Sequence, residues 1–341
     1  MGRTEMDRGT ISVIGAGSWG TALSLILGGA GWGVKLWARR GEIAAAIQRE
    51  RRNPQYLSGV LLPAGVEATA DLRRAVAGAR LVLLAVPSDG LREVCKQLSD
   101  CLQDGQGIIS AAKGLEHETG RRLSKVIEES LGPRRGEIAV LSGPNLAVEV
   151  AAGIASATVV ACGDAVFAAE AQAALSTPRF RVYTNPDVLG VELGGALKNI
   201  IAIAAGVSDG LSFGDNTKAA LLTRGLTEIT RLGVALGAKA ETFRGLSGMG
   251  DLVATCASRK SRNYLVGSEL AKGRRLDDVL AGMRQVAEGV ATARAAQRLA
   301  ARAGVEMPIA AAVYAVLFEG AAPADAVRSL MTRAWRDELE Q

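Results

Sequence analysis

The chain has 341 residues, of which 48% are apolar, 22% charged and 4% aromatic, and 40 basic against 35 acidic side chains give a net charge of +5. This length predicts two domains, at roughly 150 residues each, and the apolar content excludes wholesale disorder. Few aromatic residues and a small positive charge argue against a nucleic-acid partner and suit an anionic small molecule. The single histidine, His117, excludes a histidine-rich metal site, and we expect no metal.

Cysteine usage and hydropathy predict an intracellular protein. None of the four cysteines (Cys95, Cys101, Cys162 and Cys256) forms a C-x-x-C pair, which indicates reduced thiols. Residues 1–10 are polar and lack the apolar core of a signal peptide. The longest apolar stretch, 188–207, contains Glu192 and Lys198, so we expect a cytoplasmic protein without membrane insertion.

The first half of the chain alternates short apolar runs with longer segments of helical spacing, such as 21–30 and 121–131. This rhythm is typical of βαβ units and predicts a Rossmann-like, doubly wound parallel sheet over residues 1–187. The strands are expected at 11–14, 34–37, 81–86, 107–110, 138–141, 157–161 and 181–184.

The second half, 188–341, lacks β-branched runs and is rich in Ala, Leu and Gly. It therefore predicts an all-α domain, with Gly and Pro between the helices. The helices are expected at 188–207, 216–236, 262–272, 276–282, 289–303, 309–318 and 323–338.

The first strand runs into Gly15-Ala16-Gly17-Ser18-Trp19-Gly20 and then into a helix. In this pattern the first glycine allows a tight turn, the second lets a pyrophosphate approach the backbone, and the third lets helix and strand pack closely. The helix N-terminus favours the phosphates, so a dinucleotide site is predicted. The alternative is a turn used only for packing.

The end of the second strand bears on the choice of dinucleotide. NAD-selective sites usually place an acid there to bind the ribose 2′-hydroxyl. This chain instead has Arg39 and Arg40, with no acid before Glu42. Because guanidinium groups bind phosphate, we predict NADP(H), with NAD(H) as the second candidate. The alternative is a solvated pair of arginines that opens the next helix.

Lys198 is the most informative residue of the second half. Its neighbours on the same helical face, at spacings of three, four and seven residues, are all apolar or glycine. A desolvated lysine has a lowered pKa and can act as an acid or base near neutral pH. Gly194 and Gly195 would leave space for a bound molecule. The alternatives are a snorkelling lysine and a Gly-Gly pair that serves helix packing.

Two later clusters could complete a site around Lys198. Residues 245–251 contain three glycines and are expected to form a loop that leads to Asp251, a candidate partner for a buried ammonium. Residues 258–263 contain three cations among hydroxyls and an amide, just before a helix, which suits a phosphate. The alternative is a solvated charge run. His117 lies in a polar stretch between two glutamates and is a weak candidate for catalysis. Cys256 is another weak candidate, because nothing near it in the sequence indicates a lowered pKa.

Taken in order, these motifs resemble a known family. Segments 13–22, 85–88, 113–116, 142–144, 190–202, 223–226, 248–252, 261–263 and 305–308 are similar to the bacterial-type NAD(P)-dependent glycerol-3-phosphate dehydrogenases. The resemblance covers about residues 10–338. Family members often have Ser or Thr, then Phe, after the Gly-Pro of the fourth segment, whereas this chain has Asn145 and Leu146.

The resemblance implies reversible reduction of dihydroxyacetone phosphate to sn-glycerol 3-phosphate, which supplies phospholipid synthesis, with Lys198 as the acid/base. It places around the substrate Lys113, Gly143, Asn145, Lys198, Asp251, Ser261, Arg262 and Asn263. It places around the cofactor, besides the glycines, Ser18, Trp19, Arg39, Arg40, Lys113, Ala147, Arg262, Val286 and Glu288.

Two other functions remain open at this point. A related β-hydroxyacid dehydrogenase would share the layout but act on a carboxylate substrate. A redox-sensing NADP(H)-binding regulator would bind the cofactor without turnover, although it would need no proton donor at Lys198. The apolar helices of the second half are compatible with a homodimer.

Overall fold

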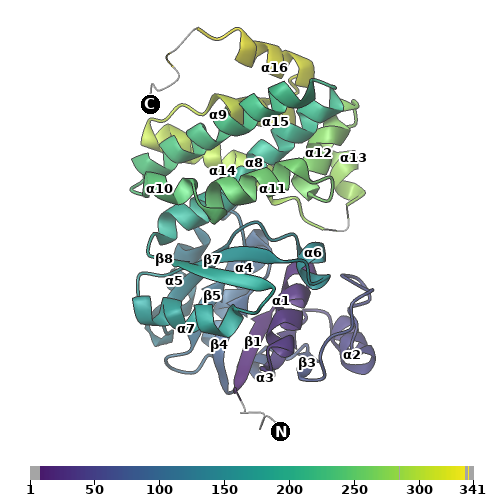
Figure 1. Cartoon of the computed structure of the whole chain (residues 1–341), viewed down its shortest axis with the longest axis vertical. Coiled ribbons are helices and arrows are strands. Elements are labelled where there is room, and N and C mark those ends of the chain that lie inside the picture. Colours follow the sequence, from purple (N-terminus) through teal and green to yellow (C-terminus); the bar gives the residue numbers. More distant parts are fainter. Residues whose placement is uncertain (1–7, 284, 335–336, 338–341) are drawn as a thin grey trace. The chain divides into compact units, whose positions relative to one another are not determined.

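A computed structural model describes residues 8–283, 285–334 and 337 of the chain (Figure 1). The predicted polar start of the chain lies largely outside these residues. The chain divides into two compact units, Met1–Ala112 with Leu123–Val188, and Lys113–Arg122 with Leu189–Gln341. The sequence-based boundary after residue 187 falls beside this division, but it does not anticipate that Lys113–Arg122 belongs to the second unit.

The first unit contains one eight-stranded sheet with the order β3-β2-β1-β4-β5-β6-β7-β8. Its first six strands follow the order typical of dinucleotide-binding sheets. The strands are β1 (Thr10–Ile14), β2 (Gly33–Trp37), β3 (Val66–Thr69), β4 (Ala79–Leu84), β5 (Gly107–Ser110), β6 (Ile138–Ser142), β7 (Ser156–Ala161) and β8 (Phe180–Asn185).

Two features of the sheet differ from the prediction. β7 runs antiparallel to β6, with Val140 opposite Ala161, so the sheet is not wholly parallel. The connection 143–155 holds only a five-residue helix, α6 (Ala147–Ala151), in place of the longer helix that usually makes a parallel crossover. Strand β3 was not predicted, because this short, half-exposed edge strand lacks an apolar run.

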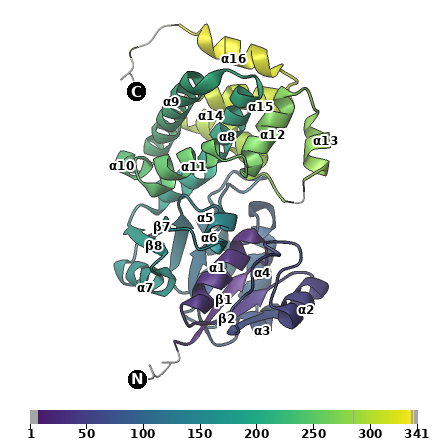
Figure 2. The ribbon, with the colours of Figure 1, turned by 45° about the vertical axis from the view of Figure 1, so that its right-hand side comes forward.

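Helices cover both faces of the sheet (Figure 2). The side chains of one strand contribute to two hydrophobic cores, one on each face of the sheet. Ile11 and Val13 of β1 pack with helix α1 (Ser18–Gly29), whereas Ile14 packs with α4 (Leu91–Ser99). This period of two is expected for strands buried on both sides. The other helices of this unit are α2 (Gly41–Glu50), α3 (Leu72–Val76), α5 (Leu123–Leu131), α6 (Ala147–Ala151) and α7 (Ala165–Leu175).

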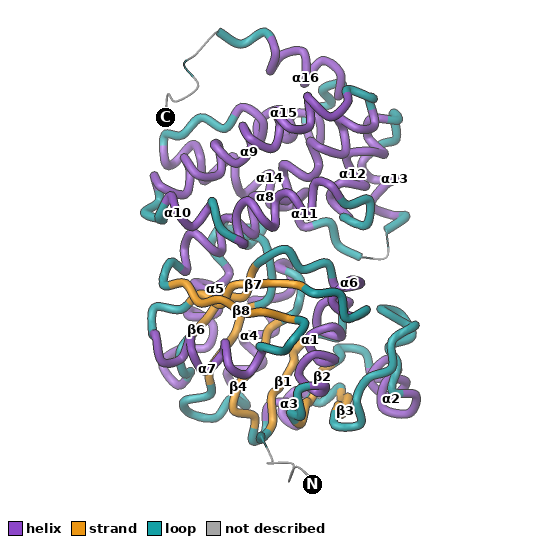
Figure 3. Tube along the Cα trace, viewed as in Figure 1, coloured by secondary structure: helices purple, strands orange, loops and turns teal. Residues whose placement is uncertain are grey.

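Apart from the segment Lys113–Arg122 and the connections, the described residues of the second unit form helices (Figure 3). Its longest helix, α8 (Val188–Gly210), is buried along most of its length. The others are α9 (Gly214–Ala235), α10 (Ala240–Phe243), α11 (Asp251–Ala257), α12 (Arg262–Ala271), α13 (Leu276–Ala281), α14 (Glu288–Ala303), α15 (Pro308–Phe318) and α16 (Pro323–Met331).

Among the described helices, α8 alone is long and apolar enough to cross a membrane. However, 83% of its most apolar window is buried in the structure, and the core helix of a folded domain has the same length and composition. The apolar surface of α8 is therefore used within the second unit.

The structure of this half differs from the predicted elements at three places. Residues 245–251 are not a loop, because Leu246–Gly250 form a π-helical turn that continues directly into α11. The short helices α10 and α11 were not predicted, since each is too short to show a helical period. Helix α16 ends at Met331, and part of the predicted 323–338 segment lies outside the described residues.

Candidate active site

Lys198 lies in the middle of α8 with only 6% of its surface exposed. Its Nζ donates hydrogen bonds to Asp251 Oδ1 at 2.6 Å and to Thr255 Oγ1 at 2.5 Å. The lysine therefore does not snorkel to solvent. Its ammonium is held inside the second unit by two side chains of α11.

Asp251 is shared between two lysines. Its second oxygen, Oδ2, accepts from Lys113 Nζ at 2.7 Å, and Lys113 is half-buried in the segment Lys113–Arg122. A buried carboxylate is costly unless it is paired and hydrogen-bonded, and here both of its oxygens face an ammonium. The cluster thus joins three segments far apart in sequence and carries a net positive charge.

The charge balance sets the acidity of Lys198. Burial lowers its pKa, the nearby Lys113 ammonium lowers it further, and Asp251 partly opposes both, so that the pKa falls to about 8. At neutral pH Lys198 is therefore still mainly protonated, yet it can release its proton far more readily than an exposed lysine. These properties suit a proton donor that must also be regenerated.

The geometry of α11 explains why Thr255 joins the cluster. Asp251 is the first residue of this helix and Thr255 lies one turn later, so the two side chains share a face. Thr255 Oγ1 also donates to Asp251 Oδ1 at 3.3 Å. Thr255 was missed by sequence analysis, and its spacing of four from Asp251 would have indicated it once the helix was recognised.

The space expected beside Gly194 is filled by protein. A Cβ atom at Gly194 would lie 2.8 Å from the Ser247 carbonyl oxygen, and one at Gly248 would lie 2.1 Å from that of Phe243. Gly194 therefore serves packing, which was the alternative interpretation of the Gly-Gly pair. These close contacts let the π-helical turn lie against α8 and bring Asp251 to Lys198.

The predicted phosphate cluster forms the start of α12. Ser261 is buried and caps this helix, with its Oγ accepting from Tyr264 N at 3.3 Å. The Arg262 side chain is exposed and donates from Nη1 to the Val286 carbonyl oxygen at 2.6 Å. The Asn263 side chain is buried, and its amide bonds to Asn199 and to the backbone of Gly289. An exposed guanidinium at a helix N-terminus is a suitable anion site.

The two weaker candidates for catalysis have no activated side chain. Burial raises the pKa of the Cys256 thiol to about 12, so it is not a nucleophile near neutral pH. His117 is exposed, and its carbonyl oxygen, not its ring, accepts a hydrogen bond from Arg298.

In the first unit, each glycine of the Gly15–Gly20 turn has the predicted geometry. Gly15 has φ of +115°, which favours glycine, and a Cβ there would lie 2.7 Å from the Ala85 oxygen. A Cβ at Gly20 would lie 1.8 Å from the Gly15 oxygen, whereas one at Gly17 would meet nothing within 4 Å. Packing thus uses Gly15 and Gly20, and Gly17 leaves the backbone open beside the N-terminus of α1.

Four other predicted cofactor residues of this unit lie within that turn or directly after β2. Arg39 and Arg40 are exposed, and Arg40 donates to the Gln55 side chain and lies 3.8 Å from Glu42. Ser18 begins α1, and the indole Nε1 of Trp19 is buried without a hydrogen-bond partner. The turn itself is held by Asn53, which donates to the Ala16 oxygen at 2.9 Å.

Gly143, Asn145 and Ala147 follow β6 in the same unit. Gly143 has φ of +157°, and a Cβ there would lie 2.9 Å from Thr158 Cα. Asn145 Nδ2 donates to the Ala157 oxygen at 3.0 Å, which leaves its buried Oδ1 without a partner. Ala147 is the first residue of α6. The amide nitrogen of Asn145 is thus hydrogen-bonded within the protein, whereas its amide oxygen can still accept a hydrogen bond.

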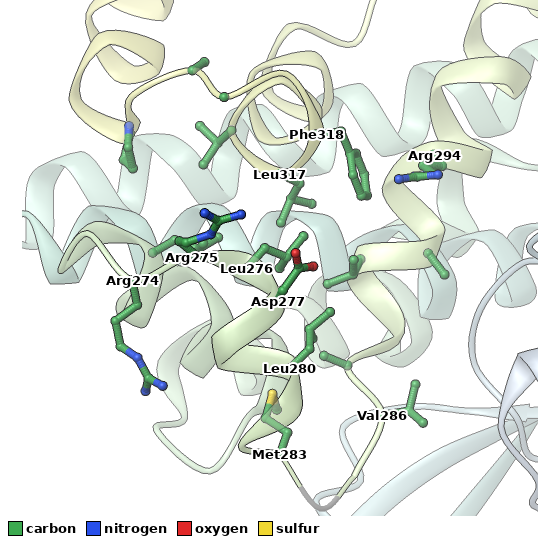
Figure 4. A pocket seen from close by; sticks show the side chains of 18 of the residues that line it. Arg274, Arg275, Leu276, Asp277, Leu280, Met283, Val286, Arg294, Leu317 and Phe318 are labelled. Carbon is green, nitrogen blue, oxygen red and sulfur yellow. The ribbon is translucent and has the colours of Figure 1, made fainter.

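Val286 and Glu288 lie at the start of α14 in the second unit, where Glu288 is the first helical residue. Val286 lines a cavity of about 1070 Å³ between α13, α14 and α15 (Figure 4). Its lining combines apolar side chains such as Leu280 and Phe318 with Arg275 and Arg294. Lys198 and Asp251 do not line this cavity.

Comparison with known proteins shows the family to which both halves of the chain are similar. Residues 10–168 match the model of the NAD-dependent glycerol-3-phosphate dehydrogenase N-terminus, and residues 187–328 match that of the C-terminus. The chain is 51% identical to a glycerol-3-phosphate dehydrogenase [NAD(P)+] of Moorella thermoacetica, over 97% of this chain and 98% of that protein. A protein of the same name from Nitratidesulfovibrio vulgaris is 49% identical over 96% and 99%.

Solved structures give the same result. The crystal structure of a glycerol-3-phosphate dehydrogenase from Coxiella burnetii superposes with a TM-score of 0.91 at 39% identity, covering 95% of this chain and 99% of that one. A ketopantoate reductase from Ralstonia eutropha shares the fold alone, with a TM-score of 0.60 at 18% identity over 93% and 99% of the chains. The chain therefore belongs to the NAD-dependent glycerol-3-phosphate dehydrogenase family of oxidoreductases.

Proposed function

We propose that the protein catalyses the reversible, NAD(P)H-dependent reduction of dihydroxyacetone phosphate to sn-glycerol 3-phosphate, with Lys198 as the proton donor and acceptor. The observation that carries this proposal is the buried ammonium of Lys198, bound to Asp251 and Thr255. Family membership supports the reaction, and the cluster supports the role of Lys198.

A reduced nicotinamide cofactor supplies the hydride that adds to the C2 carbonyl carbon. Lys198 Nζ gives a proton to the carbonyl oxygen, which becomes the C2 hydroxyl, and its positive charge stabilises the alkoxide as it forms. In the reverse direction the neutral amine takes the proton back. Asp251 and Thr255 hold the Nζ in place, and the second ammonium, Lys113, favours release of the proton.

The substrate phosphate is proposed to bind Arg262, with the start of α12 as a second source of positive potential. Binding of a group remote from the reacting carbon positions that carbon and lowers the barrier. Lys113, Gly143, Asn145, Ser261 and Asn263 remain proposed substrate residues, with the buried side chain of Ser261 acting as a helix cap.

The cofactor is proposed to bind the Gly15–Gly20 turn and the start of α1, where the missing side chain of Gly17 leaves room for a pyrophosphate. Arg39 and Arg40 support a preference for NADPH, because they can bind a 2′-phosphate. Glu42 partly neutralises Arg40, so Arg39 is the stronger determinant. Ser18, Trp19, Lys113, Ala147, Arg262, Val286 and Glu288 are the other proposed cofactor residues.

Two further proposals concern the location of the enzyme in the cell and its oligomeric state. The enzyme is proposed to work in the cytoplasm and to form a homodimer through its second unit. Light scattering after gel filtration measures the dimer directly, and a monomeric mass under assay conditions would contradict it.

The test of the proposed function is the oxidation of NADPH with dihydroxyacetone phosphate as substrate. Turnover with this substrate and little with β-ketoacids of similar size is expected. Preference for a β-ketoacid would favour a β-hydroxyacid dehydrogenase. Tight NADPH binding without turnover on any carbonyl substrate would favour a redox-sensing regulator.

A further inference from the structure

Three buried amide groups meet in the second unit, one turn or less from predicted site residues. Asn263 Nδ2 donates to Asn199 Oδ1 at 2.8 Å, and Gly289 N donates to Asn263 Oδ1 at 2.9 Å. Asn199 follows Lys198 in α8, Asn263 follows Arg262 in α12, and Gly289 follows Glu288 in α14. We refer to Asn199, Asn263 and Gly289 as the amide junction.

The junction determines which way the Asn263 side chain faces. A backbone N–H can only donate, so the group that faces Gly289 N must be the amide oxygen and not the nitrogen. The amide nitrogen then faces Asn199 Oδ1. It carries two N–H groups, and the hydrogen bond to Asn199 uses one of them.

The junction is tightly packed. Asn199 and Asn263 are 4% and 7% exposed, and a Cβ at Gly289 would lie 2.7 Å from the Asn199 carbonyl oxygen and 2.8 Å from Asn263 Oδ1. A side chain at position 289 would therefore push the three groups apart. The absence of one lets α14 approach α8 and α12 at this point.

A second bond ties the same two segments together. Arg262 Nη1 donates to the Val286 carbonyl oxygen at 2.6 Å. Residues 262 and 263 are thus bonded to residues 286 and 289, respectively, so that the start of α12 and the start of α14 are fixed to each other through two adjacent contacts.

We propose that Asn199 and the backbone N–H of Gly289 are positioning groups that fix the Asn263 amide, so that its second N–H faces the phosphate of the substrate beside Arg262. This inference rests on the proposed function and adds to it a reason why the turn after Lys198 and the start of α14 affect recognition of the phosphate. Neither Asn199 nor Gly289 touches the reacting atoms in this proposal.

Two variants test the junction. Gly289→Ala adds the methyl group that has no room, and Asn199→Leu keeps the branched shape of the side chain but replaces the acceptor oxygen with a methyl group. Gly282→Ala is the matched control, because position 282 directly follows α13 and a Cβ there would lie 3.6 Å from the carbonyl oxygens of Asp278 and Val279, which is ordinary contact. The readout is the ratio of kcat/KM for dihydroxyacetone phosphate to kcat/KM for unphosphorylated dihydroxyacetone, with NADPH.

Both variants are expected to lower this ratio about tenfold or more, mainly through KM for the phosphorylated substrate, since a hydrogen bond to a charged group is lost. Gly282→Ala should keep the ratio of the original enzyme. A purely structural role would lower kcat/KM for both substrates equally, and an unchanged ratio in folded Asn199→Leu would overturn the proposal even if Gly289→Ala does not fold.

The same assay separates this inference from the proposed function. If the original enzyme does not favour the phosphorylated substrate, the proposed function itself fails. If it does and the variants retain that preference, only the amide junction loses its role, and recognition of the phosphate is left to Arg262 and the start of α12.

Discussion

The turn Gly15–Gly20 in the first unit and the Lys198 cluster in the second are built in opposite ways. The turn consists of six consecutive residues, and its proposed function depends on backbone groups and on side chains that are missing. The cluster consists of side chains from residues 113, 198, 251 and 255, and its proposed function depends on buried charge. A site made of backbone is sensitive to volume, whereas a site made of buried charges is sensitive to the loss of a charge.

The sharpest test of this difference is Lys198→Met, which keeps the length of the side chain and removes its charge. We expect kcat with dihydroxyacetone phosphate to fall by about 10²–10⁴-fold, and further where the cation also stabilises the alkoxide. NADPH binding should change little, because the proposed pyrophosphate site is in the other unit. A folded variant that binds NADPH and works within about tenfold of the original enzyme would contradict the role of Lys198.

The next largest effect is expected for Arg262→Ala. Loss of charge-assisted hydrogen bonds to the phosphate should cost about 2–5 kcal/mol of transition-state binding with dihydroxyacetone phosphate. The loss in kcat/KM should be much smaller with unphosphorylated dihydroxyacetone. Equal losses on the two substrates would mean that Arg262 does not recognise the phosphate.

Arg39→Asp tests the side-chain part of the cofactor site. A carboxylate there should repel a 2′-phosphate and accept from a ribose hydroxyl, which changes the NADPH/NADH ratio of kcat/KM by about 1.5–3 kcal/mol. The original enzyme should prefer NADPH. If it uses both cofactors equally well, the interpretation of Arg39 and Arg40 is wrong.

Two alanine substitutions in the glycine turn separate packing from binding. Gly20→Ala places a methyl group 1.8 Å from the Gly15 oxygen and should lower the free energy of unfolding by about 1–3 kcal/mol. Gly17→Ala meets no atom within 4 Å, so it should keep the stability and raise the Kd for NADPH. Denaturant unfolding and cofactor titration measure the two effects, and equal destabilisation by both substitutions would contradict this division.

The smallest effect concerns pH. Because the pKa of Lys198 is lowered to about 8 and reduction needs its protonated form, kcat/KM for reduction should fall as the pH rises through about 8. Oxidation of glycerol 3-phosphate needs the neutral amine and should rise over the same range. In Asp251→Asn the anion that raises this pKa is gone, so the falling limb should move to lower pH. A pH profile that is the same in both enzymes would contradict the assignment.

Sequence analysis predicted most of the fold where local patterns are strong. The two classes of structure, most strands and the long helices follow from apolar periods of 2.0 and 3.6 residues. The misses have local causes. Strand β3 is short and polar, α11 is only seven residues long, and the antiparallel pairing of β7 depends on the path of the chain after β6.

The sequence by itself indicated the candidate sites that are contiguous: the glycine turn, the arginines after β2, and a lysine in an apolar helical stripe. Only the tertiary structure decided that Asp251 bonds to two lysines, that Thr255 joins them, and that the Asn263 amide meets Asn199 and Gly289. The physical reason is that backbone geometry is set within a few residues. The pairing of buried polar groups instead depends on which distant segments pack together, and a desolvated charge or amide must find its partner there.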